Sequence, residues 1–304
     1  TLPASARHAL EGQGGDHRLA HNLYGLLMAR ASWEGFRKHA PERRPFLLTR
    51  SGHAGVQRYA WAWTGDVEST WEGLRTTLRA LLGLSLSGVY FVGSDIGGFS
   101  GNPSPELYLR WFQMAALTPF FRLHAARWTK RREPWRFGEE VLEGVRRAMA
   151  LRESLLPYLY TLAHRASREG KPLLRPLFLE GERILGKYGY PPGLEEGARA
   201  KEVPLPKGGW YPWGEDRALQ GPTWARLPAP LDRIPLLVRA GTVLPLLEEG
   251  GLALHLYPGA EGAEGRLDWA EGEGEGPYRR DRFRLLPAEA PLAVGPACTT
   301  RPSC

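Results

Sequence analysis

Two hydrophobic patterns alternate along the first 180 residues. Apolar residues at helical spacing predict four helices, and short runs of Val, Leu and aromatic residues predict buried strands between them. The expected helices cover residues 21–40, 68–82, 105–117 and 139–168, with a break at Pro157 in the last. The expected strands cover residues 46–49, a run ending at about Trp63, 89–93 and 173–179. This alternation predicts about four parallel βα units, which is half of an eight-stranded (β/α)8 barrel.

The pattern changes after Glu180, where Gly and Pro become frequent and helical spacing disappears. Short apolar runs then predict a small β-sandwich. These runs cover residues 203–205, 235–239, 242–247 and 252–257. We expect a Gly/Glu-rich loop over residues 261–276 and a disordered Pro/Ala-rich tail over residues 287–304.

The predicted fold class is therefore α/β, with three regions. They are the second half of a TIM-barrel domain in residues 1–180, a partial proximal β-sandwich in residues 181–258, and the start of a distal β region with a disordered tail in residues 259–304.

Two aspartates stand at the ends of predicted strands. Asp66 follows a run rich in Trp and Ala, and Asp95 follows a run rich in Val and aromatic residues. The carboxyl ends of barrel strands form the active-site face, where a carboxylate serves chemistry better than core packing. Nearby aromatic residues, Trp63 and Phe99 among them, offer surfaces on which a sugar ring stacks.

The basic charge of the chain does not indicate a nucleic-acid partner. The net charge is +7 with a pI near 9.5, but only six of the 40 basic residues are Lys, and the Arg residues are spread along the whole chain. The one short basic cluster, Arg127 to Arg132, is interpreted as a solvated loop, because phosphate binding needs several converging cations. The eleven Trp residues favour a carbohydrate ligand instead.

We expect no metal, no organic cofactor and no membrane partner. The two cysteines, Cys298 and Cys304, lie in the last seven residues and form no metal motif. The longest apolar runs are too short to span a bilayer. Because the first residue is Thr, the sequence does not decide whether the protein has a signal peptide. We expect the protein in the cytoplasm.

Several motifs follow one another in a fixed order. They are the segments 21–30, 44–51, 58–66, 93–99, 121–124, 175–178, 210–211, 229–235 and 239–242. In this order they resemble the α-glucosidases of glycoside hydrolase family 31, from about His21 to Glu180 and again from Leu194 to Leu246. The resemblance implies the C-terminal part of a (β/α)8 barrel followed by β-sandwich domains, without metal or cofactor.

The resemblance also implies roles for individual residues. Asp66 is the general acid/base of a retaining mechanism, which protonates the leaving glycosidic oxygen and then activates water. The implied substrate-binding residues are Arg50, Trp63, Asp95, Phe99 and His124. The plain structural alternatives are a helix N-cap for Asp66 and an Asx turn for Asp95.

The expected activity is release of terminal non-reducing α-linked glucose from oligosaccharides. The nucleophile of the family lies in a Trp-x-Asp-Met-Asn-Glu segment that has no counterpart in this sequence. We therefore expect half of an active site, a truncated or frame-disrupted gene product, and a missing N-terminal half-barrel as the natural partner of the open sheet edges. Self-association into a homo-oligomer is left open.

Two other functions compete with this one. A catalytically inactive family member or carbohydrate-binding remnant would keep pocket residues without a nucleophile. A basic nucleic-acid binder would show salt-sensitive retention on heparin. Loss of aryl α-glucoside hydrolysis on replacing Asp66 by alanine would favour the enzyme.

Overall fold

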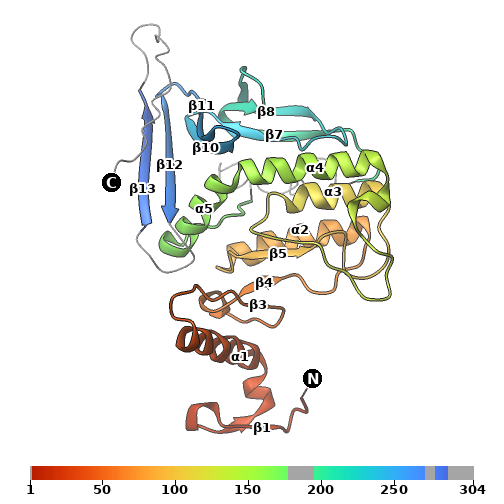
Figure 1. Ribbon diagram of the computed structural model, residues 1–304, viewed down its shortest axis with the longest axis vertical. Coiled ribbons are helices and arrows are strands. Elements are labelled where there is room, and N and C mark those ends of the chain that lie inside the picture. Colours follow the sequence, from red (N-terminus) through yellow and green to blue (C-terminus); the bar gives the residue numbers. More distant parts are fainter. Residues whose placement is uncertain (1, 177–194, 271–277, 287–304) are drawn as a thin grey trace.

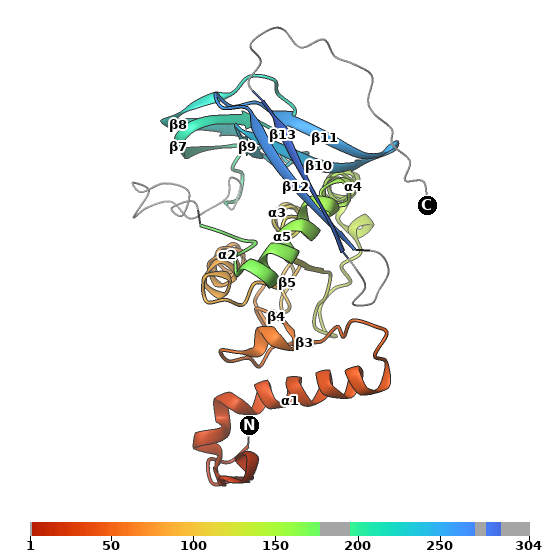
Figure 2. The ribbon, with the colours of Figure 1, turned by 90° about the vertical axis from the view of Figure 1, so that its left-hand side faces the viewer.

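The computed structural model describes residues 2–176, 195–270 and 278–286. Its elements follow one another along the long axis (Figure 1). Helix α1 lies at one end, next to the parallel strands, and helices α2 to α4 lie between these strands and the C-terminal strands at the other end. The view turned by 90° shows the same order (Figure 2). No helix of the described residues is long and apolar enough to cross a membrane.

The N-terminal region contains a four-stranded parallel sheet in the order β3-β4-β5-β6. The strands are β3 (Leu48–Thr49), β4 (Trp61–Trp63), β5 (Val92–Asp95) and β6 (Phe120–Arg122). A Cβ atom at Gly93 would lie 2.1 Å from the carbonyl oxygen of Phe120, so glycine is required for β5 to approach β6. This α/β arrangement of parallel strands and helices confirms the predicted fold class.

One of the four predicted strands is wrong, in the part that the structure describes. Residues 173–176 form no strand, and residues 177–179 lie outside the described residues. Leu174 packs against the hydrophobic core, and its carbonyl oxygen accepts a hydrogen bond from Ser85 Oγ over 2.8 Å. The apolar run is therefore explained by burial without strand pairing, and β6 takes the fourth place in the sheet.

Helices follow the strands in the predicted order. They are α1 (His17–His39), α2 (Trp71–Leu86), α3 (Pro105–Ala115), α4 (Glu139–Ser154) and α5 (Leu156–Glu169). The chain breaks between α4 and α5 at Leu155, two residues before Pro157, as predicted. Short elements complete the N-terminal region: β1 (Arg7–His8), η1 (Leu10–Gly12), β2 (Gly15–Asp16), η2 (Val56–Arg58) and η3 (Pro134–Phe137).

The identity of the N-cap residue of α2 shows whether Asp66 is used in helix capping. Thr70 Oγ1 accepts a hydrogen bond from the backbone N–H of Gly73 over 2.9 Å, so Thr70 is the N-cap. The structural alternative in which Asp66 caps this helix is therefore wrong. The hydroxyl of Ser69 instead donates to the carbonyl oxygen of Ser100 over 2.7 Å. The carboxylate of Asp66 is thus not used in capping this helix.

Helix α3 joins the barrel helices to the C-terminal strands. All nine residues from Leu107 to Ala115 are buried. Among them, Arg110 donates hydrogen bonds to the carbonyl oxygens of Ala198 (2.9 Å), Ala229 (2.6 Å) and Pro230 (3.1 Å). Burial lowers the pKa of Arg110, because the loss of hydration outweighs the opposing attraction of the Glu106 carboxylate. The carbonyl contacts fix this helix against the segments before and after the first long hairpin of the C-terminal region.

The C-terminal region contains two antiparallel-rich sheets. One has the order β8-β7-β9 and the other β11-β10-β12-β13. The strands are β7 (Ala200–Pro212), β8 (Leu219–Pro228), β9 (Leu237–Arg239), β10 (Thr242–Glu248), β11 (Gly251–Tyr257), β12 (Ala263–Ala270) and β13 (Tyr278–Leu285). The four apolar runs predicted as strands fall largely within β7, β9, β10 and β11.

The predicted loop at 261–276 is wrong where it is described. Residues 263–270 form β12, which pairs with β13 along its whole length and with β10 at Thr242. The Gly/Glu-rich composition of this region concealed a strand whose pairing partner, β13, is the next strand in the sequence. The predicted domain boundary at residue 258 therefore falls between β11 and β12, which belong to one sheet. The predicted disordered tail, residues 287–304, lies outside the described residues.

A buried ionic cluster attaches β12 and β13 to helix α5. Asp268 has no exposed surface and forms ion pairs with Arg266 (2.5 Å) and Arg280 (2.9 Å), and its N–H donates to Thr161 Oγ1 over 3.0 Å. Burial alone would raise the pKa of Asp268, but hydrogen bonds from the two guanidinium groups outweigh it and hold the pKa below its usual value. Arg266 also pairs with Glu169 at the end of α5.

Glu169 gives this attachment a defined pH dependence. Hydrogen bonds from Arg266 and Lys171 lower the pKa of Glu169 to about 2, from an ordinary value of 4.5. Its carboxylate therefore stabilises the fold fully above about pH 4.5, and this stabilisation is lost as pH falls through about 2. We expect the difference in unfolding free energy between the parent and Glu169→Gln, measured in urea, to shrink over this range. A difference that is constant with pH would contradict the assignment.

Candidate active site

Four successive strand ends place polar side chains along one edge of the parallel sheet. Arg50 follows β3, Asp66 follows β4, Asp95 ends β5, and His124 follows β6. Because the four strands are parallel, their carboxyl ends lie on the same side of the sheet. The structure thus brings these predicted site residues to one face.

Asp66 forms an ion pair with Arg50 at this edge. Arg50 Nη1 donates to Asp66 Oδ2 over 2.9 Å, and both side chains remain about half exposed, at 58% and 46%. Gly65, with a φ of +80°, turns the chain after β4, and a Cβ there would approach Arg50 Cδ to 3.2 Å. The accessible carboxyl group of Asp66 suits proton transfer to a bound ligand.

Asp95 is buried, with 2% of its side chain exposed, and is paired with Arg122. Arg122 Nε donates to Asp95 Oδ1 over 3.1 Å, while Asp95 Oδ2 has no hydrogen-bond partner among the described residues. Burial raises the pKa of Asp95, opposed by the hydrogen bond from Arg122. The side chain forms this ion pair rather than the Asx turn considered as its alternative. Its Oδ2 atom is thus a buried acceptor whose hydrogen-bonding capacity no described residue uses.

Aromatic rings lie at the ends of the same strands and on the loops that follow them. The guanidinium of Arg122 lies 5.1 Å from the ring centre of Trp63, and the rings of Phe99 and His124 stack at 5.7 Å. Trp128 packs edge-on against Phe99 at 6.4 Å and is 79% exposed. The sequence analysis did not single out Trp128, although its place four residues after His124 was a usable signal. Such exposed rings offer stacking surfaces for the C–H faces of a sugar.

Comparison with known proteins decides the family. Residues 3–162 match the family model for the glycosyl hydrolases family 31 TIM-barrel domain, and residues 178–244 match the model for the glycosyl hydrolase family 31 C-terminal domain. This chain belongs to glycoside hydrolase family 31. The resemblance drawn from the sequence motifs is confirmed.

The family 31 relatives are longer than this chain. Alpha-glucosidase 2 of Bacillus thermoamyloliquefaciens is 38% identical over 258 residues, which cover 81% of this chain and 33% of that protein. Neutral alpha-glucosidase C of Homo sapiens is 40% identical over 255 residues, which cover 79% and 28%. The crystal structure of a glucosidase II alpha subunit superposes with a TM-score of 0.82 at 31% identity, over 89% of this chain and 33% of that one. The chain thus spans about a third of these relatives.

Arg132 holds together the two loops that carry the predicted site residues Asp66 and Phe99. It is 5% exposed, and its guanidinium donates to the carbonyl oxygens of Gly98 and Gly101 and to Ser69 Oγ. The loop after β4 is thereby tied to the loop that carries Phe99. The interpretation of residues 127–132 as a solvated basic loop is wrong for Arg132, which is a buried structural cation.

Gly98 is the point of closest approach between these loops. Its φ is +82°, and an added Cβ would lie 2.8 Å from the backbone of Ser69. At Gly101, where φ is +78°, the nearest atom would be 3.6 Å away. A left-handed conformation costs an L residue roughly 1–2 kcal/mol at either position. We expect Gly98→Ala to lower the melting temperature more than Gly101→Ala, and equal melting temperatures would contradict the contact.

The described residues contain no group of three or more ligating side chains that could hold a metal ion. His17 and His21 lie one helical turn apart on α1, and the structure brings His8 beside His17. His17 Nδ1 contacts His8 Nε2 at 3.0 Å, and His17 Nε2 contacts His21 Nδ1 at 3.3 Å. Because opposite nitrogens of His17 are used, the rings form a hydrogen-bonded chain instead of converging on one point.

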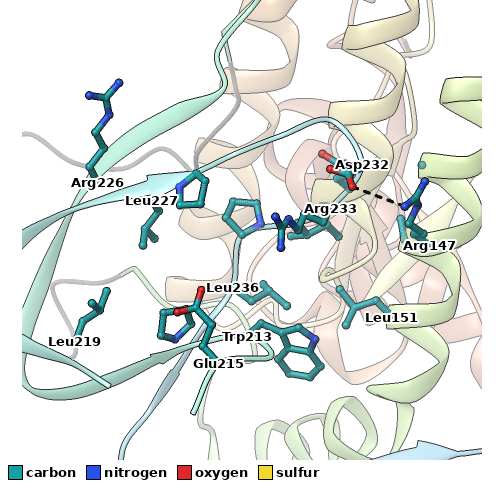
Figure 3. A pocket seen from close by; sticks show the side chains of 17 residues that line it. Arg147, Leu151, Trp213, Glu215, Leu219, Arg226, Leu227, Asp232, Arg233 and Leu236 are labelled. Carbon is teal, nitrogen blue, oxygen red and sulfur yellow. Dashed lines mark ion pairs between the residues drawn. The ribbon is translucent and has the colours of Figure 1, made fainter. Parts of the chain in front are cut away.

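A cavity of about 330 Å³ lies between α4 and the C-terminal strands, away from the predicted site residues (Figure 3). Leu151, Trp213 and Leu236 form part of its wall, and Arg147 pairs with Asp232 over 3.7 Å at its side. None of the predicted site residues lines it. We attribute this cavity to imperfect packing between the helices and the strands, because no strand end of the parallel sheet reaches it.

Proposed function

We propose that this chain forms part of a retaining α-glucosidase, which releases terminal non-reducing glucose from α-linked oligosaccharides in the cytoplasm. The observation that carries the proposal is the placement of Asp66, half exposed and free of helix capping, at the active-site edge of a family 31 barrel sheet. The names of the relatives, alpha-glucosidase 2 and neutral alpha-glucosidase C, support the α-glucoside substrate.

Asp66 acts as the general acid and then as the general base. In the first step its carboxyl proton passes to the leaving glycosidic oxygen while a second carboxylate attacks the anomeric carbon. In the second step Asp66 takes a proton from water, which displaces that carboxylate. Arg50 donates a hydrogen bond to Asp66 over 2.9 Å and so holds the carboxyl group in place at the end of β4.

The attacking carboxylate comes from outside these residues. Retaining glycosidases place their two carboxyl groups about 5–5.5 Å apart in an accessible site. Asp95 does not fit this role, because it is buried and paired with Arg122. We assign Asp95 to substrate binding, through its free Oδ2 atom, and the nucleophile to the family segment that this sequence lacks.

A fusion protein tests the proposal. In it, the part of the Bacillus enzyme that precedes the matched region is joined to Thr1 of this chain. We expect the fusion to hydrolyse a 4-nitrophenyl α-glucoside and to release α-glucose first, as followed by proton NMR. A fusion that melts cooperatively without hydrolysing the glucoside, or that releases β-glucose first, would contradict it.

The competing function is a catalytically inactive carbohydrate-binding remnant. The exposed ring of Trp128 beside Phe99 supports it, because stacking on a sugar needs no nucleophile. The folded but inactive fusion would support this alternative if it still bound maltose, because binding requires the pocket residues and hydrolysis requires the nucleophile in addition.

A further inference from the structure

A second cavity lies behind the loop that carries Phe99. Its volume is about 330 Å³, and it is formed where the loop after β5 meets the segment between β6 and η3. The backbone N–H of Lys130 donates to Asn102 Oδ1 over 2.8 Å, which joins the two segments at the cavity wall. Pro103 and Phe137 supply apolar surface.

The wall of this cavity carries four cationic side chains and no acidic one. The cations are Lys130, Arg131, Arg132 and Arg136. The nearest carboxylate along the chain, Glu133, is held by Arg136 at 3.0 Å. Within the described ranges, the side chains of Lys130 and Arg131 have no acidic partner, and both are exposed. Like charges gathered around one cavity repel one another, and a bound anion would relieve that repulsion.

Arg132 supplies an unsatisfied donor in the wall. Its two terminal nitrogens donate to Gly98, Gly101 and Ser69, but Nε is buried without a hydrogen-bond partner in the described part of the chain. The side chain is 5% exposed. A buried unsatisfied N–H is costly, and native structures usually satisfy it with a ligand or water. The charge of this guanidinium adds to that of the exposed cations, although Nε itself has no surface open to the cavity.

We infer that this cavity binds the phosphate group of a small phosphate monoester. Guanidinium and ammonium groups recognise phosphate oxygens by charge-assisted hydrogen bonds. Lys130 and Arg131 are the exposed donors of this wall, and Arg132 and Arg136 add positive charge beside them. The volume exceeds that of the anion alone and lies at the lower end for small-molecule sites, so an organic body of about sugar size fits beside Phe137. A long polyanion is disfavoured, because the cations surround one concavity instead of following a groove.

Anion binding in this cavity does not require the proposed hydrolysis. The cavity and the proposed active site nevertheless share one residue that contacts both, Arg132. Arg132 lines the cavity and also holds the loop that carries Phe99. An anion on Arg132 is therefore expected to stabilise this loop and to raise the melting temperature of the chain.

Calorimetry and thermal unfolding of the chain test this site. The probes are glucose 6-phosphate, inorganic phosphate and glucose, each at an ionic strength matched with sodium chloride. The test variant is Lys130→Ala/Arg131→Ala, which removes two exposed cations of the wall. The matched control is Arg127→Ala, which removes an exposed cation of the same segment that does not line the cavity.

We expect glucose 6-phosphate to bind and raise the melting temperature, with affinity at least tenfold lower in the double variant and unchanged in Arg127→Ala. Binding of inorganic phosphate with equal affinity would assign the recognition to the phosphate group alone. Absence of binding by both phosphates, binding of glucose with equal affinity, or equal weakening by Arg127→Ala would overturn the inference. Arg131→Glu, with Arg127→Glu as control, repeats the test if the double variant does not melt cooperatively.

Discussion

Replacing Asp66 by alanine is expected to lower kcat for maltose by about 10²- to 10⁴-fold in the fusion protein, the range for removing a general acid/base. The physical reason is that the poor leaving group, a sugar alkoxide, needs the proton that Asp66 supplies. The half-exposed carboxyl group at the end of β4 is placed to supply it. Steady-state kinetics on maltose measures the effect.

Substrates with different leaving groups distinguish proton transfer by Asp66 from a structural role of its side chain. Dinitrophenolate departs from a dinitrophenyl α-glucoside without being protonated. Asp66→Ala should therefore slow the first step of hydrolysis far less for this substrate than for maltose. Glu68→Ala is the matched control, since it removes an exposed carboxylate two residues away. Equal loss on both substrates, or equal loss in Glu68→Ala, would show that Asp66 supports the fold and not the proton transfer.

Asp268→Ala is expected to be the most destabilising single change that this structure identifies. The change leaves Arg266 and Arg280, 17% and 32% exposed, without their shared carboxylate. Removing one partner of a buried ionic cluster costs about 3–5 kcal/mol. The contacts of β12 and β13 with α5 should therefore open first. Urea unfolding of the whole chain gives the free energy, and hydrogen exchange of β12 amides locates the opening.

Asp281→Ala provides the comparison for this loss. Asp281 pairs with Arg279 over 2.8 Å on the neighbouring strand, but the arginine is 72% exposed. Surface pairs contribute up to about 1 kcal/mol, so this variant should unfold close to the parent. Similar losses in the two variants would show that burial of Asp268 does not determine its contribution.

The position of the site residues could be predicted because it follows from strand ends. Asp66 and Asp95 each come directly after a short apolar run, and parallel strands end on a common edge. The partner of each side chain was harder to predict. The contact of Arg50 with Asp66 depends on the turn at Gly65, and the exposure of Asp66 depends on which nearby residue caps α2.

The errors arose where long-range contacts overrode local pattern. Asp66, Ser69 and Thr70 are all suitable caps, and Thr70 is the cap because the hydroxyl of Ser69 is bonded to Ser100 across the loop. Strand β6 has three residues, too few for a periodic signal, and forms by pairing with β5. Arg132 lies in a run of basic residues whose neighbours are exposed, and nothing local distinguishes the buried one.

The buried guanidinium of Arg110 has a consequence for synthesis of the chain. Its carbonyl acceptor at Pro230 is made 120 residues after it. At about 5–20 residues per second, roughly 6–24 s separate the two on the ribosome. Throughout that interval the cation has to stay hydrated, so α3 cannot take its final place when it emerges. The helical core of this chain therefore closes late, after the first β-hairpin of the C-terminal region has left the exit tunnel.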